Sequence, residues 1–267
     1  LTACSASTQS NSEAGIAKSW IDKDTGHRIV RVSEEPGSRS LYFHQNAYTA
    51  EGDKMVISVT NPNGVAVVDL SDWSVKRLYE HPDVGILFVG KQTRNVYLTR
   101  ITGDNGQKVH PQNELQQPTE LLRVNIDTGA VEELGAIPAG KIHTINSNET
   151  LLAGAVAERE HNLESGPRNS RFEARYEALG PDGKPLSFAE AKEVRINERL
   201  EARIPMQMFT FNISTGEQQT VHEATDWLNH IQFSPGDPGQ LMYCHEGPWH
   251  KVDRIWTMRV DGSDNQK

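Results

Sequence analysis

Two turns of nearly identical sequence, Asn125-Ile126-Asp127-Thr128-Gly129 and Asn212-Ile213-Ser214-Thr215-Gly216, decide the fold of this 267-residue chain. A further version, Val260-Asp261-Gly262-Ser263, follows near the last residues. Asn, Asp, Ser, Thr and Gly tolerate the positive φ of tight turns and close them with side-chain hydrogen bonds. The two complete copies each join runs rich in β-branched and aromatic residues, so both predict strand pairs. A turn that recurs in this way indicates a structural repeat.

Working outward from these turns, four segments share one order of four short strands separated by polar turns. In residues 41–80 the predicted strands are Leu41–Thr49, Lys54–Thr60, Val65–Leu70 and Val75–Tyr79. In residues 84–134 they are Ile86–Val89, Asn95–Arg100, Glu120–Ile126 and Ala130–Leu134. Residues 141–222 repeat the order, and residues 226–267 begin it again. A unit of this kind, roughly 40–50 residues long, is the blade of a β-propeller, whereas a β-sandwich rarely repeats its turns so regularly. We expect an all-β fold, a β-propeller with about four blades in this chain.

The third repeat contains a charged insertion, Glu158–Ile204. Within it, Ser187-Phe188-Ala189-Glu190 matches a capping box, and Ala191–Arg203 suits the helix that would follow. Six arginines gather in the insertion: Arg168, Arg171, Arg175, Arg195, Arg199 and Arg203. Two interpretations stay open, a solvated helical face paired with glutamates or a lid whose guanidinium groups clamp carboxylates.

The two ends of the repeat region indicate an incomplete ring. The last unit stops after its third-strand turn, and the strand predicted at Gly26–Val32 precedes the first unit without a blade of its own. In propellers such a strand often completes the last blade. We therefore expect residues 20–267 to be propeller blades of a truncated molecule whose C-terminal blades are missing.

The first residues predict a lipid anchor. Leu1-Thr2-Ala3-Cys4 looks like the lipobox of a bacterial lipoprotein, and the polar run Ser5–Glu13 has the composition of a flexible tether. We expect residues 1–19 to be a tether lipidated at Cys4, which places the protein in the periplasm as an outer-membrane lipoprotein. Membrane contact is expected only through this anchor, because no stretch approaches the ~18 apolar residues of a membrane span.

The charge balance narrows the class of partner. The net charge is −9, so a nucleic-acid-binding role is not expected, because phosphate binding needs a positive surface. A local arginine cluster could still bind an anionic sugar. The two cysteines suggest no disulfide framework, and Cys244 in the run Leu241–Cys244 reads as a buried strand thiol.

The densest chemistry lies in one stretch of the fourth repeat, which comprises Asp226–His230, Phe233–Pro235, Cys244–His250 and Val252–Trp256. Residues at one end of a propeller converge on its central pocket. His230 is predicted on the first strand, which lines the channel, and Arg254 at the start of the third. His245, Glu246 and His250 are predicted in the loop after the second strand.

This stretch resembles the oligogalacturonate lyases, pectin-degrading propellers in which a Trp-Leu-x-His strand is followed by Cys-His-Glu-Gly-Pro and then by a Val-Asp pair and an arginine. The matching residues are Trp227–His230, Cys244–Pro248 and Val252–Arg254. Residues Tyr42–Thr49 and Gly26–Arg28 also resemble the opening of that family. The resemblance covers roughly residues 20–267 and implies seven blades in the full-length protein.

The resemblance implies metal-assisted β-elimination of oligogalacturonides to unsaturated products. Arg254 would be the catalytic cation that neutralises the substrate carboxylate. The family's base histidine and its metal ligands belong to later segments, beyond Lys267. The resemblance therefore implies a divalent metal, taken as Mn²⁺, held beyond the end of this chain, and a chain that is inactive alone.

The remaining candidates are substrate contacts rather than metal ligands. His44, Gln45, His230, His245 and Glu246 are the predicted substrate-binding residues, although a purely structural role for His44 stays open. Gln107–Gln112 superficially echoes a ligand run, but in the wrong blade, and we interpret it as a loop. His245 and His250 lack a third ligand nearby, so no metal site is expected in this chain.

Two other functions stay open. One is a lyase acting on another uronate-containing glycan, which the lipoprotein-like start of the chain motivates. The other is a non-catalytic periplasmic propeller that binds sugars or proteins. The sequence indicates neither the oligomeric state nor the length of the substrate.

Overall fold

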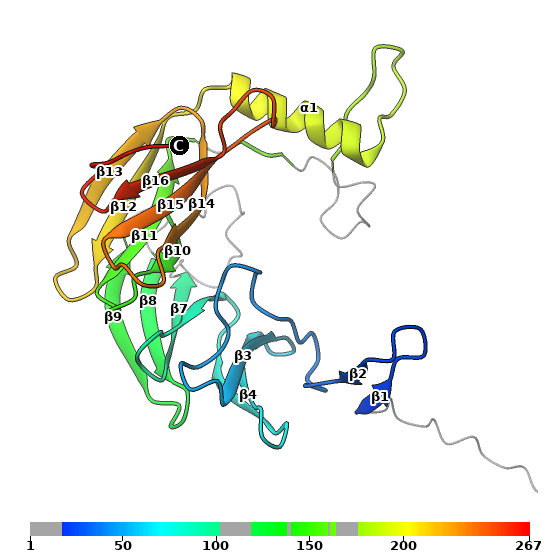
Figure 1. Ribbon diagram of the computed structural model, residues 1–267, viewed down its shortest axis with the longest axis vertical. Coiled ribbons are helices and arrows are strands. Elements are labelled where there is room, and N and C mark those ends of the chain that lie inside the picture. Colours follow the sequence, from blue (N-terminus) through cyan, green and yellow to red (C-terminus); the bar gives the residue numbers. More distant parts are fainter. Residues whose placement is uncertain (1–17, 102–118, 138–139, 160, 164–175) are drawn as a thin grey trace, which may run out of the picture.

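The computed structural model describes residues 18–101, 119–137, 140–159, 161–163 and 176–267. These residues form four antiparallel sheets that follow one another along the chain and around an arc (Figure 1). Each sheet is built from consecutive strands, as in a propeller blade. The predicted all-β propeller with about four blades is confirmed.

The strands of each sheet are ordered as they occur in the chain. The first sheet contains β3 (Lys54–Val59), β4 (Gly64–Asp69) and β5 (Val75–Glu80). The second contains β6 (Val84–Val89), β7 (Asn95–Ile101), β8 (Thr119–Asn125) and β9 (Val131–Ile137). The third contains β10 (Lys141–Ile145), β11 (Leu151–Ala157), β12 (Met206–Asn212) and β13 (Gln218–Ala224). The fourth contains β14 (Trp227–Phe233), β15 (Gln240–Glu246) and β16 (Ile255–Arg259).

Apolar side chains between neighbouring sheets hold the arc together. Between the third and fourth sheets, Met208 packs in one cluster with Leu228, Leu241 and Met258, and each of the four is at most 1% exposed. Burying a large apolar side chain contributes roughly 1.5–3 kcal/mol. Similar clusters join the first sheet to the second and the second to the third. The sheets therefore stack face to face, and β10, the first strand of the third sheet, contacts the first strands of both neighbouring sheets, β6 and β14.

The strand predicted at Leu41–Thr49 is wrong, and the structure shows a loop there. Two isolated bridges, Arg39↔Ser58 and Tyr48↔Met55, attach its ends to β3. Between them the chain turns on a hydrogen bond from the Gln45 amide to the Tyr42 carbonyl, 2.8 Å long. The alternation of apolar and polar residues in this segment resembles that of a strand. The chain instead leaves the sheet and returns to it, so the residues between the two bridges can face the centre of the arc.

The elements outside the four sheets were largely anticipated. The predicted helix forms as α1 (Phe188–Glu201), and its capping box between Ser187 and Glu190 is present. In Figure 1 the carboxyl end of α1 meets the sheets and its amino end points away from them. The strand predicted at Gly26–Val32 forms as β2 (Arg28–Val30), which pairs with β1 (Ser19–Ile21) in a separate hairpin. Cys244 is buried, as expected for a strand thiol.

Several predictions fall outside the described residues, and the structure does not bear on them. They are lipidation at Cys4 with its tether, the loop Gln107–Gln112, and the insertion arginines Arg168, Arg171 and Arg175. Over the part of the chain that the structure describes, no helix is long and apolar enough to cross a membrane.

Glu149 joins the second and third sheets through their turns. Its carboxylate accepts hydrogen bonds from the amides of Gln92 and Thr93, 2.6 and 2.9 Å long, and from the Tyr97 hydroxyl at 2.8 Å. Burial by itself would raise the pKa of Glu149, but the hydrogen bonds from Thr93, Gln92 and Tyr97 hold it below its usual value. The carboxylate is thus a fixed acceptor between two blades.

We expect Glu149→Ala to lower the free energy of unfolding by about 2–4 kcal/mol, because Tyr97 is only 1% exposed and its hydroxyl would lose its acceptor. Urea unfolding measures the change. Glu133→Ala is the matched control, because this carboxylate is 69% exposed and its pair with Arg100 should contribute little. Equal stabilities of the two variants would contradict the role given to Glu149.

Candidate active site

Three segments far apart in the sequence line one cavity of about 240 Å³ at the centre of the arc. The loop before β3 contributes Tyr42, His44 and Gln45, β10 contributes Lys141, Ile142 and His143, and β14 contributes Asn229 and His230. We call this the His44 cavity. Three of the predicted site residues, His44, Gln45 and His230, therefore meet in one place, while Lys141 and His143 are additions that were not predicted.

A bulge recurs in the innermost strands and explains which side chains reach the cavity. The register shifts between Ile86 and Phe88 in β6, between Ile142 and Thr144 in β10, and between Asn229 and Gln232 in β14. A bulge leaves its extra residue unpaired and re-aims the side chain. The extra residues include His143 in β10 and His230 in β14.

The bulges also fix the backbone and the neighbouring loop. His230 adopts a positive φ of 49°, which is uncommon for a residue with a side chain. In β6 the bulge residue is Leu87, whose carbonyl accepts a hydrogen bond of 2.6 Å from the Gln45 side chain. The loop before β3 is thereby tied to the second sheet at the point where it turns His44 inward.

Lys141 is the cation among the residues that line the His44 cavity, and it lies close enough to act on the histidines beside it. Burial lowers the pKa of His44, and the nearby His230 and Lys141 lower it further. Burial lowers the pKa of His143 to about 3, with additional contributions from Lys141, His44 and His230. The His44 Nδ1 atom is buried and has no hydrogen-bond partner. An anion in the cavity would oppose this repulsion, because a nearby negative charge favours the protonated imidazole.

The depressed pKa of His143 predicts a pH-dependent stability. Between about pH 3 and 6.5 the unfolded chain binds a proton that the folded chain does not. Stability is therefore complete above the ordinary histidine pKa and falls as the pH drops, by up to about 1.4 kcal/mol per pH unit. Urea unfolding at pH 7 and pH 5 should show a smaller loss for His143→Gln than for the unsubstituted chain. The exposed His250, replaced in His250→Gln, is the control, and an equal effect of both substitutions would contradict the assignment.

Glu246 supports the cavity from outside its wall. Its carboxylate accepts a hydrogen bond of 2.7 Å from the Asn229 side chain and lies 3.6 Å from the His230 Nε2 atom. It sits at the end of β15 rather than in the following loop, so the loop predicted to begin before His245 starts later. Glu246 thus orients Asn229 and His230, and direct contact with a substrate stays a prediction.

His245 lies in different surroundings from the other predicted contacts. Its Nδ1 atom is 3.1 Å from the Asp226 carboxylate. Its ring packs at 5.5 Å from that of Tyr243 and at 5.3 Å from that of Trp256. It does not line the His44 cavity. These contacts suit a histidine that fixes the β13–β14 connection, and its predicted role in substrate binding remains untested.

Arg254 directly precedes β16, as predicted, but it does not line the His44 cavity. Its guanidinium lies 4.0 Å from the centre of the Trp249 ring and donates a hydrogen bond of 2.5 Å to the Gly247 carbonyl. Its Nε atom is buried without a partner. Burial raises the pKa of the Cys244 thiol, Glu246 raises it further and Arg254 lowers it, so both charged groups act on the same thiol.

Arg254 also lacks an acidic partner among the described residues. Within the described ranges, most other arginines of the four sheets form ion pairs with acidic side chains, whereas Arg254 forms none. A guanidinium that has no carboxylate of its own can bind one from a ligand.

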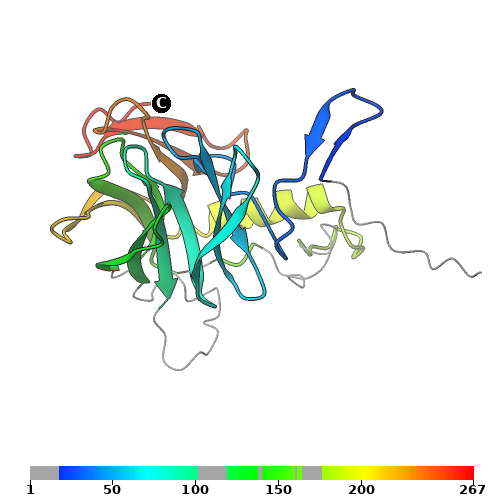
Figure 2. The ribbon, with the colours of Figure 1, turned by 90° about the horizontal axis from the view of Figure 1, so that it is seen from below.

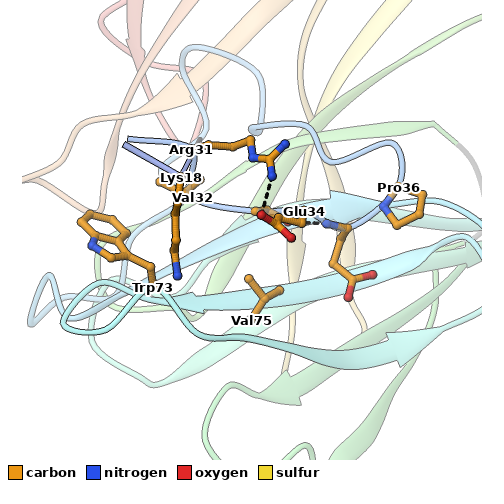
Figure 3. A pocket seen from close by; sticks show the side chains of 9 residues that line it. Lys18, Arg31, Val32, Glu34, Pro36, Trp73 and Val75 are labelled. Carbon is orange, nitrogen blue, oxygen red and sulfur yellow. Dashed lines mark hydrogen bonds and ion pairs between the residues drawn. The ribbon is translucent and has the colours of Figure 1, made fainter. Parts of the chain in front are cut away.

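A larger hollow, about 360 Å³, lies at the first sheet, between the segment after β2 and β5 (Figure 3). Arg31 and Glu34 form an ion pair on one segment of its lining, and Trp73 and Val75 belong to the other side. Glu35 is also paired, with Arg77 at 2.8 Å. Since these acids are already matched by bases, this hollow offers less to a charged ligand than the His44 cavity.

Lys141 and His143 were missed because no motif surrounds them. The signal was the repeat itself: Lys141–His143 opens the third repeat at the place where Asn229 and His230 stand in the fourth. Aligning the first strands of the repeats would have put both histidines on the inner wall. The bulge that makes them point inward cannot be read from composition.

With the geometry in place, comparison with known proteins identifies the chain's relatives. Residues 191–267 match the family model described as oligogalacturonate lyase. The oligogalacturonate lyase of Dickeya dadantii (strain 3937) is 23% identical over 262 residues, which cover 93% of this chain and 56% of that protein. This chain is related to the oligogalacturonate lyases. The predicted resemblance is confirmed.

Solved oligogalacturonate lyase structures share the fold. The enzyme from Vibrio parahaemolyticus is 20% identical with a TM-score of 0.66, and a complex of an oligogalacturonate lyase with manganese is 20% identical with a TM-score of 0.67. Each match covers 93% of this chain and 58% of the other. The chain thus spans little more than half the length of the oligogalacturonate lyases that it matches.

Proposed function

We propose that the protein is a lyase that cleaves oligogalacturonides by β-elimination. The observation that carries the proposal is the His44 cavity, where His44, His143 and His230 surround Lys141 at the centre of the arc. A site with a lysine ammonium and several imidazole groups that can hydrogen-bond to hydroxyls suits an anionic sugar. The relationship to oligogalacturonate lyases supports uronate as that sugar.

The reaction makes a specific demand on such a site. A base removes the C5 proton of a uronate residue, the electron pair forms the C4–C5 double bond, and the C4–O bond breaks. The departing sugar oxygen leaves as an alcohol once protonated. The negative charge on the carboxylate opposes the first step, so cations beside the carboxylate stabilise the transition state.

Arg254 is proposed as the catalytic cation. A guanidinium stays charged at all working pH values and can bind both carboxylate oxygens with two parallel hydrogen bonds. Gly247 and Trp249 already orient the Arg254 side chain, which limits the entropy lost when a ligand binds. In this proposal the His44 cavity holds the sugar, with Gln45 and the neutral imidazoles of His44 and His143 as hydrogen-bond partners for hydroxyl groups.

A divalent metal belongs to the proposal, since one structural relative is a complex with manganese. Within the described ranges, no group of three or more His, Cys, Asp and Glu side chains could hold a metal ion. The described residues therefore do not fit the ion, and its ligands would come from other residues.

The function is tested by mixing the natural protein with trigalacturonate and Mn²⁺ and following the ultraviolet absorbance of the unsaturated product. Appearance of the product supports the proposal. Product from other uronate-containing glycans, and none from trigalacturonate, would replace it with a lyase of different specificity. Binding without product from any uronate would replace it with a sugar-binding propeller.

A further inference from the structure

Arg199 is a buried cation that has no counterion among the residues the structure describes. It lies in the last turn of α1 and is only 5% exposed. Its Nη2 atom donates a hydrogen bond of 3.2 Å to the Met206 sulfur, a weak acceptor. Its guanidinium lies 5.9 Å from the centre of the Trp227 ring, and its Nη1 atom is buried with no hydrogen-bond partner. No acid among the described residues pairs with it.

The one acid that acts on Arg199 is already engaged. Burial lowers the pKa of Arg199 and nearby Arg159 lowers it further, while Asp226 raises it. Both carboxylate oxygens of Asp226 are in use, one with Arg203 at 2.6 Å and the other with His245 at 3.1 Å. Keeping an unpaired charge out of water costs several kcal/mol, so an anion that pairs with Arg199 would offset this cost.

Arg199 lines a second cavity of about 200 Å³ beside the first. Arg159 and His161 of the insertion also line it, so three of its basic groups come from this segment. The remaining polar wall consists of Lys141, His143 and Asn229, all three of which also line the His44 cavity. The two cavities are therefore neighbours that share a wall, and the second adds cations to the first.

The helix that carries Arg199 is fixed to the sheets on several sides. Arg203 binds Asp226 ahead of β14, and Lys251 donates a hydrogen bond to Asn197 from the loop between β15 and β16. The Arg159 side chain reaches the Ala202 carbonyl at 3.3 Å. The Arg199 guanidinium is thus positioned before any ligand arrives, which favours binding.

We propose that the Arg199 cavity is a second carboxylate subsite, which binds the uronate next to the one held in the His44 cavity. The inference rests on the proposed function, because a polyuronate is the ligand that presents a carboxylate on successive sugars. The planar guanidinium of Arg199 matches a carboxylate with two parallel hydrogen bonds. The insertion then makes the site selective for chains over single sugars, and Arg199 follows the carboxylate-binding interpretation of its arginines in this proposal.

The test compares binding of galacturonate and trigalacturonate to the natural protein and to Arg199→Met, by calorimetry without the metal. We expect trigalacturonate to bind about 10–100-fold more weakly to the variant, the range of a lost charge-assisted pair. Galacturonate should bind as before, within about twofold. Lys192→Met removes the same charge from the exposed face of α1 and is the matched control, expected to change neither affinity.

A stability measurement protects the test against a folding defect. Methionine relieves a buried, unpaired charge, so the melting temperature of Arg199→Met should equal or exceed that of the natural protein. Arg199→Lys keeps the charge but cannot donate two parallel hydrogen bonds to a carboxylate. Its affinity for trigalacturonate should therefore lie between that of the natural protein and that of Arg199→Met. If Arg199→Met keeps the preference for trigalacturonate, or loses both sugars equally while folded, the subsite is refuted although the proposed function stands. If the natural protein binds neither sugar, the proposed function falls together with the subsite.

Discussion

Arg254→Ala is expected to lower the kcat of the natural protein on trigalacturonate by about 10²–10³, with a smaller change in KM. This is the loss found when a preorganised group that stabilises developing charge is removed. The Arg254 guanidinium is held by Gly247 and Trp249 but bonded to no acid within the described ranges, which suits the proposed role. Initial rates of unsaturated product formation measure the change.

Two controls separate catalysis from folding in this experiment. Arg254→Lys keeps the positive charge but not the two parallel hydrogen bonds of a guanidinium, and it should recover part of the lost rate. Arg259→Ala removes an arginine from β16 that is already paired with Asp237 at 2.7 Å, and its kcat should remain within twofold of the natural value. Unchanged turnover in a folded Arg254→Ala protein would remove Arg254 from the mechanism.

Lys141→Met is expected to raise KM for trigalacturonate by about 10–100-fold, because Lys141 lines both cavities and is their common cation. The same substitution should raise the histidine pKa values, since Lys141 contributes to the low pKa of both His44 and His143. Titration by NMR gives this second readout independently of activity. Lys184→Met, at a side chain that is 81% exposed, is the control for loss of a lysine.

Two other outcomes would change the role given to Lys141. If KM and both histidine titrations are unchanged in the variant, the ammonium group does not face the cavities and the electrostatic account of the site is wrong. A raised KM with unchanged titrations would confine Lys141 to direct contact with the sugar.

The repeat could be predicted from the sequence because its turns carry their own chemistry. The side chains of Asn125 and Asn212 each accept hydrogen bonds from the backbone amides two and three residues later. Gly129 and Gly216 adopt the positive φ that closes each turn. These local bonds set the spacing of the strands, and the spacing is visible in the sequence. The capping box of α1 was predictable for the same reason.

The site was only partly predictable, because long-range contacts assemble it. The loop at Leu41–Thr49 reads as a strand, yet the chain turns there on the hydrogen bond from the Gln45 amide to the Tyr42 carbonyl. His143 carries no motif and faces the His44 cavity because of a bulge in β10. Arg199 looked like one of many helical arginines, and only packing against Met206 and Trp227 reveals that it is buried.

The central claim is that the innermost segments of the arc form a pocket for a uronate carboxylate. A crystal structure of the natural protein with trigalacturonate, in an Arg254→Ala background that slows turnover, tests it most directly. The account predicts one sugar among His44, His143 and His230, with its carboxylate near Lys141, and further carboxylates at Arg199 and at the position of the replaced Arg254 side chain. A sugar bound on the outer face of the sheets, with the His44 cavity holding only water, would contradict it.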